Sequence, residues 1–227
     1  NIISNTPMLK PNTNLPGYVF TVRPDLNFSR ANLKIDRKMS PLLTDNANSI
    51  MRAIRCILAP QCMMPMHQAG FINRSDRMSY IDCPLVDKHY PFIAVSDNNV
   101  KTLTGWPSNR LGIRNTPAGI LKEVHIMADG PATYKGDFSL NMSLNSMKGN
   151  PLMYLYYYWI LYIGMVYTQS YGLMPWPEYL SNGRMDYTTR IYRLIMDETK
   201  TYVTEAAMTG YAIPTSIDIG PYFDYQS

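Results

Sequence analysis

The sequence has six Cys and His side chains that could ligate zinc or act as nucleophiles: Cys56, Cys62, Cys83, His67, His89 and His125. A structural zinc site needs four such ligands at short, regular spacings. Cys62 and His67 could supply half of a site, but no second pair accompanies them. The cysteines form no C-x-x-C motif, and their odd number, with no secretory signal visible, is typical of reduced thiols. The sequence therefore predicts no metal site and no cofactor.

Motifs for catalysis are missing as well. The sequence has no glycine-rich phosphate loop, no H-E-x-x-H and no G-x-S-x-G. Asp186, Asp197 and Glu198 stand at expected turns or strand ends, so they are not interpreted as an acid-base pair. A site built from distant residues is the alternative, and it would need a buried polar cluster such as His67, Arg74, Asp76 and Asp82. The preferred interpretation is a non-catalytic protein.

The segment "NPLMYLYYYWILYIGMVYTQSYG", from Asn150 to Gly172, has an uncharged stretch about as long as the roughly 20 residues that cross a bilayer. It contains six tyrosines: Tyr154, Tyr156, Tyr157, Tyr158, Tyr162 and Tyr167. Each would carry a hydroxyl into hydrocarbon, where an unpaired polar group is costly, and the chain as a whole has a mean hydropathy of −0.20. We therefore expect no membrane span here.

This segment reads as a soluble helix instead. Asn150 suits the N-cap, Pro151 the first helical position and Gly172 the end of the helix. A helix that is apolar around most of its circumference must be covered on most sides. Two interpretations follow: a core helix, or a helix between subunits in which tyrosine rings are buried and hydroxyls find partners at the edge.

The elements around this helix are predicted to be strands. Phe138 to Leu144 alternates apolar and polar residues, which indicates a strand with one buried face. After the helix, Thr188–Met196 and Thr201–Tyr211 are two β-rich runs joined by the polar turn Asp197–Lys200, which predicts a hairpin. The chain then breaks at Pro214 and ends in a short, extended tail.

The first half of the chain is less regular. A strand is expected at Tyr18–Val22, and an amphipathic helix is expected to begin near Asp45 or Asn46 and to stop at Pro60. The stretch from Gln61 to Thr116 has many prolines and no sustained period, so we expect an irregular excursion there. Another strand is predicted at Leu121–Met127.

Charge is distributed unevenly along the chain, whose net charge is +4. The residues up to Leu121 hold 14 Lys and Arg against 7 Asp and Glu, whereas the rest hold 7 against 10. This asymmetry is either ordinary solvated surface or a source of complementarity between copies or partners. A nucleic-acid footprint at Arg30, Lys34, Arg37 and Lys38 is conceivable, but the run lacks interleaved aromatic residues and a recognised binding motif.

The C-terminal region resembles the tail-tube fold of contractile phage tails and related injection machines. The resemblance lies in "YKGDFSLNMSL", in an aromatic helix containing Trp159 and Tyr162, in the hairpin, and in the phrase "GYAIPTSI" from Gly210 to Ile217. The early "PGYVFTVRPDLNF" is similar to a first barrel strand. Together these segments cover residues 134–227 and 16–28, a little under half of the chain.

The resemblance implies a mainly β (α+β) fold, a tail-tube-like antiparallel β-sandwich or barrel with one prominent aromatic helix. It implies a single domain over residues 1–227, in which residues 29–133 form an irregular, partly helical insertion between the first strand and the C-terminal core. Family members form hexameric rings around a channel through which DNA passes non-specifically, and they meet neighbouring tube, sheath or baseplate proteins. The large insertion favours a specialised ring, such as a tube initiator or a baseplate-hub adaptor, in a virion assembled in the host cytoplasm.

Nine residues are expected to carry core packing and assembly. Those in the packing of helix on strand are Phe138, Leu140, Tyr156, Trp159 and Tyr162, and those in and after the ring-forming hairpin are Arg190, Tyr202, Tyr211 and Pro214. Two alternatives remain: a non-catalytic adaptor that docks one partner through its aromatic helix, and a nucleic-acid-processing enzyme. Ring formation separates the adaptor from the tube, because a tube ring buries both sheet edges in copies of itself, whereas an adaptor leaves one edge free.

Overall fold

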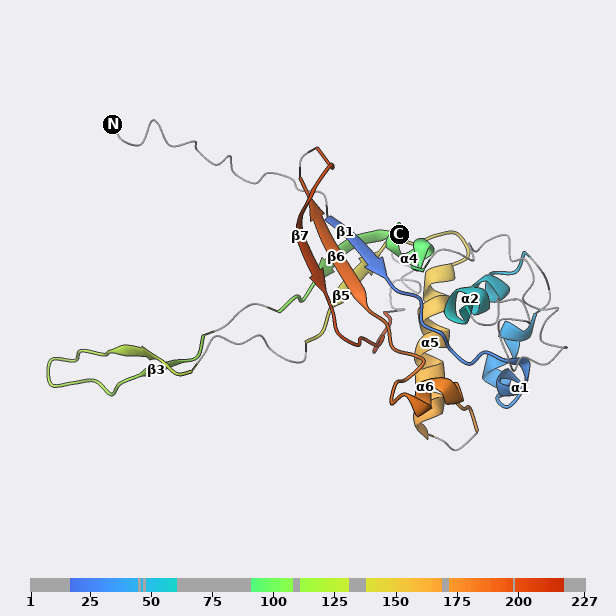
Figure 1. The fold of residues 1–227 in the computed structure, drawn as a ribbon, viewed down its shortest axis with the longest axis horizontal. Coiled ribbons are helices and arrows are strands. Elements are labelled where there is room, and N and C mark those ends of the chain that lie inside the picture. Colours follow the sequence, from blue (N-terminus) through green and yellow to red (C-terminus); the bar gives the residue numbers. More distant parts are fainter. Residues whose placement is uncertain are drawn as a thin grey trace, which may run out of the picture. The chain divides into compact units, whose positions relative to one another are not determined.

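The computed structural model describes residues 17–44, 46, 48–60, 91–107, 111–130, 138–168, 172–197 and 199–218 (Figure 1). The chain divides into two compact units, one formed by Asn1–Asn98 with Ser146–Ser227 and the other by Asn99–Asn145. The proposed polar cluster at His67, Arg74, Asp76 and Asp82 lies outside the described residues, as do Cys62, Cys83 and His89.

Six helices are described in the first unit: α1 (Arg30–Leu33), η2 (Arg37–Leu43), α2 (Ile50–Leu58), α4 (Ala94–Asp97), α5 (Pro151–Thr168) and α6 (Pro177–Ser181). Polar side chains cap the N-termini of α1 and η2. The Ser29 hydroxyl accepts a hydrogen bond from the backbone N–H of Asn32, and the Asp36 carboxylate accepts one from the backbone N–H of Lys38. The predicted amphipathic helix is α2, and its N-cap is Ser49 rather than Asp45 or Asn46.

The core of the first unit is built around α5, which begins at Pro151 as predicted. Its buried residues are Leu152, Leu155, Tyr158, Trp159, Tyr162 and Met165. Facing them in one hydrophobic cluster are Leu26, Phe28, Leu33, Met39, Leu42, Ile54 and Leu58. Most of these partners come from the start of the expected insertion, so Leu33, Met39, Leu42, Ile54 and Leu58 are part of the core. Among the described helices, none has the length and hydropathy needed to cross a membrane.

A three-stranded sheet completes the first unit, with β1 (Gly17–Thr21), β6 (Ile191–Met196) and β7 (Val203–Met208) in the order β1-β6-β7. Both pairings are antiparallel, with Phe20 opposite Tyr192 and Tyr192 opposite Met208. The predicted hairpin is confirmed, and its turn is ordered by Asp197, whose carboxylate accepts from the backbone N–H groups of Thr201 and Tyr202.

The second unit consists of two nested antiparallel pairs. The outer pair is β2 (Val100–Thr104) with β5 (Asn141–Leu144), and the inner pair is β3 (Ile113–Asn115) with β4 (Ile126–Ala128). The predicted strand at 138–144 is thus present from Asn141 onward, and it pairs with β2. The strand predicted at Leu121–Met127 was wrong in its first half, because Gly119–Glu123 forms a turn and β4 starts only at Ile126.

The fold class is accordingly mixed. Helices and antiparallel strands are both present, as predicted for an α+β fold, and the strands form small open sheets. Within the described residues none of these sheets closes on itself, so the barrel or sandwich stays a prediction.

Candidate assembly interface

The outer edge of β7 presents backbone groups that pair with no described strand. Thr209 donates its N–H to the carbonyl of Ile191, which fixes which residues of β7 bond to β6. Hydrogen-bonded pairs alternate along an antiparallel ladder, so Ala207 and Glu205 bond to β6 while the N–H and C=O groups of Ala206 and Met208 point away from it. No described strand lies on that side.

Large apolar side chains surround this edge. Tyr202 is 71% exposed, Val203 51%, Met208 52% and Tyr211 64%. In Figure 1, β7 lies at one edge of the sheet beside β6. An exposed apolar strand edge is a ready template for pairing with another chain.

The opposite edge of the sheet, on β1, is partly covered. The Thr21 N–H donates to Oδ1 of Asp97 at 3.0 Å, and the Thr21 carbonyl accepts from the N–H of Ile93 at 2.9 Å. Burial raises the pKa of Asp97 to about 6, although the hydrogen bonds from Thr21 act in the opposite direction. By the same ladder alternation, the outward backbone groups of Val19 and Gly17 lie beyond this cover.

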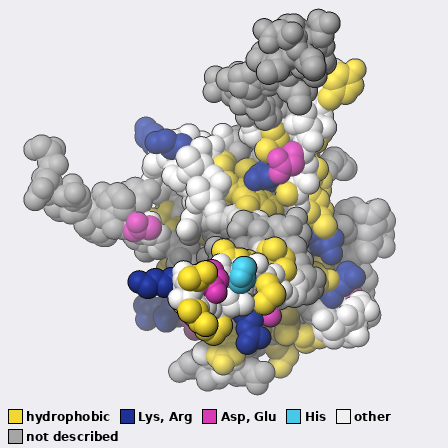
Figure 2. All heavy atoms as spheres, turned by 90° about the vertical axis from the view of Figure 1, so that its left-hand side faces the viewer, with side chains coloured by type: hydrophobic (Ala, Val, Ile, Leu, Met, Phe, Trp, Pro, Cys, Tyr) yellow, Lys and Arg dark blue, Asp and Glu magenta, His cyan; other side chains and the backbone are white. Residues whose placement is uncertain are grey.

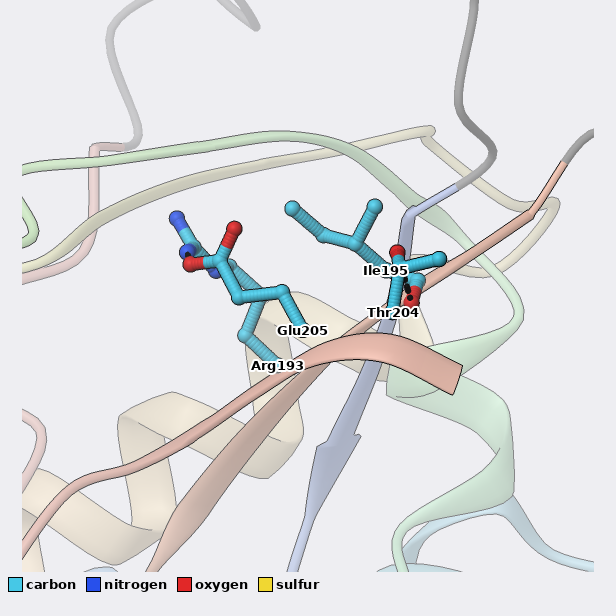
Figure 3. Close-up of polar contacts among 4 residues, drawn as sticks. All are labelled: Arg193, Ile195, Thr204 and Glu205. Atoms are coloured by element: carbon cyan, nitrogen blue, oxygen red, sulfur yellow. Dashed lines mark hydrogen bonds and ion pairs between the residues drawn. The ribbon is translucent and has the colours of Figure 1, made fainter. Parts of the chain in front are cut away.

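Polar contacts hold the β6–β7 register. Arg193 on β6 and Glu205 on β7 form an ion pair, with side chains 28% and 55% exposed. Figure 3 shows Arg193, Glu205 and Ile195 together, with the Thr204 hydroxyl donating to the Ile195 carbonyl at 3.0 Å. The register shifts at this point, because Thr204 is the extra residue of a bulge.

The predicted residues of the hairpin lie at its surface. Arg190 places its guanidinium carbon 5.5 Å from the ring centre of Tyr211, a cation–π contact, and both residues are exposed. Tyr202 ends the turn that precedes β7, and Pro214 is half-buried beyond the isolated bridge between Thr189 and Ala212. Tyr202 thus lies at the turn of the hairpin, whereas Arg190, Tyr211 and Pro214 lie at its opposite end.

The predicted residues of α5 lie in the core. The Trp159 indole is buried and donates from Nε1 to the Tyr187 carbonyl at 2.9 Å, and its ring stacks with that of Tyr156. The Tyr156 hydroxyl is 2.8 Å from the Ser96 hydroxyl, and burial raises the pKa of Tyr156 to about 12. Of the two interpretations of this helix, the buried face fits the core helix, and Tyr157 and Tyr167 remain exposed.

Asp186 is a structural residue that the sequence interpretation passed over as a strand-end position. It is 2% exposed, and its Oδ2 accepts from the Tyr162 hydroxyl and from the backbone N–H groups of Asn27 and Trp176. Nearby, the Tyr179 hydroxyl donates to Asp25 at 2.8 Å. The local sequence "GRMDYTT" gives no signal for this role, because the partners lie far away in the chain.

The remaining candidates, Phe138 and Leu140, belong to the second unit. Both are half-buried, and the Phe138 ring lies 6.2 Å from that of Trp106. Their packing against the aromatic helix stays a prediction. Within the described residues there is no group of three potential metal ligands, and Cys56 is buried.

An open, apolar sheet edge on an α+β core is typical of a structural protein that assembles. The chain matches, over residues 1–227, the family described as "Putative phage tail tube protein", and it belongs to that family. It is therefore a component of the virion that associates with other tail proteins, in a family that is typically structural and non-catalytic. Comparison with curated proteins and with solved structures finds no significant match.

Proposed function

We propose that this chain is the subunit of a tail ring, in which copies join through the edges of the β1-β6-β7 sheet. The observation that carries this proposal is the open edge of β7, where Ala206 and Met208 direct backbone groups outward, toward no described strand, between exposed apolar side chains. Backbone pairing along such an edge provides affinity, and the flanking side chains provide specificity.

The two edges of the sheet are formed by different strands, which is compatible with a ring. One edge belongs to β7 and the other to β1, so a contact between them is head-to-tail rather than two-fold. Head-to-tail contacts close into rings when the rotation between copies permits it. Each copy would then supply both an open β7 edge and the outward groups of Val19 and Gly17 on β1.

The resemblance to tail-tube folds supports the finer parts of the proposal: six copies in the ring, and a central channel through which DNA passes during ejection. It also supports a contractile tail, with the ring at the tube, at its initiator or at the baseplate hub. The chain does not need a cofactor for this role, because the work of the ring is structural.

Replacing Ala206 by proline tests the proposal directly. Proline at this outward position removes an edge N–H without removing a bond to β6, so the subunit should fold but stay monomeric. The matched control is Ala206→Val, which keeps the N–H and should still assemble. Light scattering with negative-stain imaging would measure mass and symmetry, for the chain alone and together with the other tail proteins.

Six-fold rings from the wild type and from Ala206→Val, with folded monomers from Ala206→Pro, are the expected result. Assembly of Ala206→Pro to the wild-type extent would overturn the role of the β7 edge. A folded wild-type chain that stays monomeric with every tail partner would instead favour the adaptor that docks through its aromatic helix.

A further inference from the structure

The two edge strands of the β1-β6-β7 sheet run in the same direction. β1 is antiparallel to β6, and β6 is antiparallel to β7, so β1 and β7 are parallel to each other. Copies in a ring are related by rotation about one axis, and in the proposed ring of six each copy is turned by only a sixth of a circle. Such a rotation does not reverse a strand. β7 of one copy therefore meets β1 of the next copy in a parallel orientation.

Among the described residues, the outer edge of β1 is open only at its beginning. Ladder alternation directs the backbone groups of Gly17, Val19 and Thr21 away from β6. The Thr21 N–H donates to Oδ1 of Asp97 at 3.0 Å, and the Thr21 carbonyl accepts from the Ile93 N–H at 2.9 Å. Gly17 and Val19 direct their groups toward no described strand. An incoming strand can thus bond to Gly17 and Val19, whereas the edge at Thr21 is occupied.

The outward groups define how the two strands can align. On β7 they belong to Ala206 and Met208. In a parallel ladder the bonds are evenly spaced and slanted, so an outward residue of one strand bonds to two alternate residues of the other. One alignment places Ala206 beside Tyr18. The Ala206 N–H then reaches the Gly17 carbonyl, and the Val19 N–H reaches the Ala206 carbonyl. The Met208 N–H reaches the Val19 carbonyl, which adds a further bond between the copies.

Other alignments are blocked or lose bonds. Moving β7 two residues toward the end of β1 brings Ala206 beside Phe20, where the Ala206 carbonyl needs the Thr21 N–H. Asp97 already accepts from that N–H. Moving β7 two residues the other way takes Ala206 past the first residue of β1. A shift of one residue brings opposite faces of the two strands together.

The side chains fit the alignment of Ala206 beside Tyr18. Phe20 lies opposite Tyr192, and Tyr192 lies opposite Met208, so these residues share one face of the sheet. Met208 of one copy would lie beside Phe20 of the next, whose ring is 5.3 Å from that of Phe92. Methionine sulfur makes favourable contacts with aromatic rings. Met208 is 52% exposed in the single chain, so the contact would cover it.

Charge does not oppose the contact. β1 has no charged residue, and Glu205, the charged residue of β7, is paired with Arg193 of its own chain. Figure 2 looks onto the side of Figure 1 where β7 borders its sheet, and above the centre an acidic and a basic side chain lie together among hydrophobic ones. A mainly apolar surface around a neutralised pair suits a second copy of the chain.

We propose that neighbouring copies join in a parallel ladder with Ala206 beside Tyr18, and that Asp97 is the stop that sets this register. The inference rests on the proposed ring and adds the direction and the alignment of its contacts. A slip of two residues displaces a copy by about 7 Å along the strand. A closed ring needs the same register at every contact, and Asp97 excludes the slipped one.

Paired cysteines test the direction. Gly17 and Glu205 lie side by side in the proposed ladder, so G17C/E205C should form disulfide-linked oligomers in assembled particles. The matched control is G17C/A207C, because these two positions are adjacent only if the strands are antiparallel around Tyr18 and Ala206. It should give at least about tenfold less covalent oligomer, since its Cα atoms lie beyond the reach of a disulfide. Non-reducing gels measure the yield, and the single variants give the background from the native cysteines.

Releasing the Thr21 N–H tests the stop. V19C/E205C corresponds to the slipped register and should crosslink at least about tenfold less than G17C/E205C while Asp97 is present. Adding D97A should raise its yield at least about fivefold, because the freed N–H can then bond to a neighbouring copy. Adding D97N should not, because the Asn oxygen still accepts from Thr21. Circular dichroism shows that the variants compared are folded.

Several results would overturn the inference while leaving the ring intact. More oligomer from G17C/A207C than from G17C/E205C would show an antiparallel contact, and crosslinking of E205C by itself would show a two-fold contact between β7 strands. Equal yields from V19C/E205C and G17C/E205C in the presence of Asp97 would remove its role as a stop. If negative-stain images of the wild type with the other tail proteins show no rings, the proposed ring fails first.

Discussion

The Tyr162 hydroxyl donates a 2.6 Å hydrogen bond to Oδ2 of Asp186, and both side chains are buried. This contact joins the middle of α5 to the segment that leads into β6. Burial raises the pKa of Asp186, although its hydrogen bonds from Tyr162, Asn27 and Trp176 lower it. The pair therefore fixes the sheet-forming half of the chain to the helical core.

Replacing Tyr162 by phenylalanine should destabilise the fold while keeping the ring contact with Phe28. The Asp186 oxygen would lose its side-chain donor inside the protein, which typically costs about 1–3 kcal/mol. Denaturant unfolding followed by far-UV circular dichroism would measure the change. Tyr157→Phe is the matched control, since Tyr157 is 40% exposed and its substitution should change stability by less than about 0.5 kcal/mol. Equal effects of the two variants would contradict the structural role of the pair.

Asp97 should make stability depend on pH. Its pKa in the folded protein is about 6, above the ordinary 3.8, so the protonated form is favoured in the folded state. The stability that this provides is complete below about pH 4 and is lost as pH rises through about 6. The free energy of unfolding should thus fall more steeply over this interval in the wild type than in Asp97→Asn.

Asp197 provides a control, because its pKa is shifted in the opposite direction to that of Asp97. Hydrogen bonds from Thr199, Tyr202 and Thr201 lower its pKa, so its stabilising effect is present above its ordinary pKa and is lost only in more acidic solution. Asp197→Asn should therefore leave the pH dependence between about 4 and about 6 unchanged. Identical pH profiles for the wild type and Asp97→Asn would rule out the assignment to Asp97.

A charge at Trp159 should unfold the first unit. Trp159→Asp loses a buried indole and its bond to Tyr187, and it buries a carboxylate, so we expect a cost above about 4 kcal/mol. Tyr167→Asp on the same helix should remain folded, because Tyr167 is 87% exposed. Thermal unfolding separates the two, and gel filtration shows whether the second variant still assembles. A folded Trp159→Asp would mean that α5 is not the core helix described above.

Two glycines in left-handed conformations should respond differently to alanine. Gly105, with φ of +96°, lies close to the backbone of Ser139, and a Cβ on residue 105 would overlap the Ser139 carbonyl oxygen. Gly183, with φ of +65°, has open space around it. Gly183→Ala should cost about 1 kcal/mol through backbone strain alone, and Gly105→Ala clearly more. Hydrogen exchange at β2 and β5 would report the local loss, and equal protection in both variants would count against the close contact.

Local signals in the sequence were enough for several elements. The proline at 151 marked the start of α5, and two β-rich runs around a polar turn marked β6 and β7, because these features act within a few residues. Non-local partners could not be predicted in the same way. Alternation identified the strand that ends at Leu144, but not its pairing with Val100.

The candidate site was predictable in part for the same reason. Tyr202 and Tyr211 were expected in the hairpin, and they flank its open strand at the surface. Asp186 could not be assigned a partner, since Asn27 is 159 residues away in the chain. Leu121 was interpreted as the start of a strand because apolar runs usually become buried elements, whereas here Ile120 and Leu121 form an exposed turn.

The division of the core between two distant segments also governs when the protein can fold during synthesis. Leu26, Phe28 and Leu58 leave the ribosome early, but their partners Leu155 and Trp159 follow only after the second unit has been made. β6 and β7 come later still. The open edge of β7 is consequently synthesised after the residues of the helical core, so in the proposed ring a nascent chain could not offer this edge to another copy before its core residues are available.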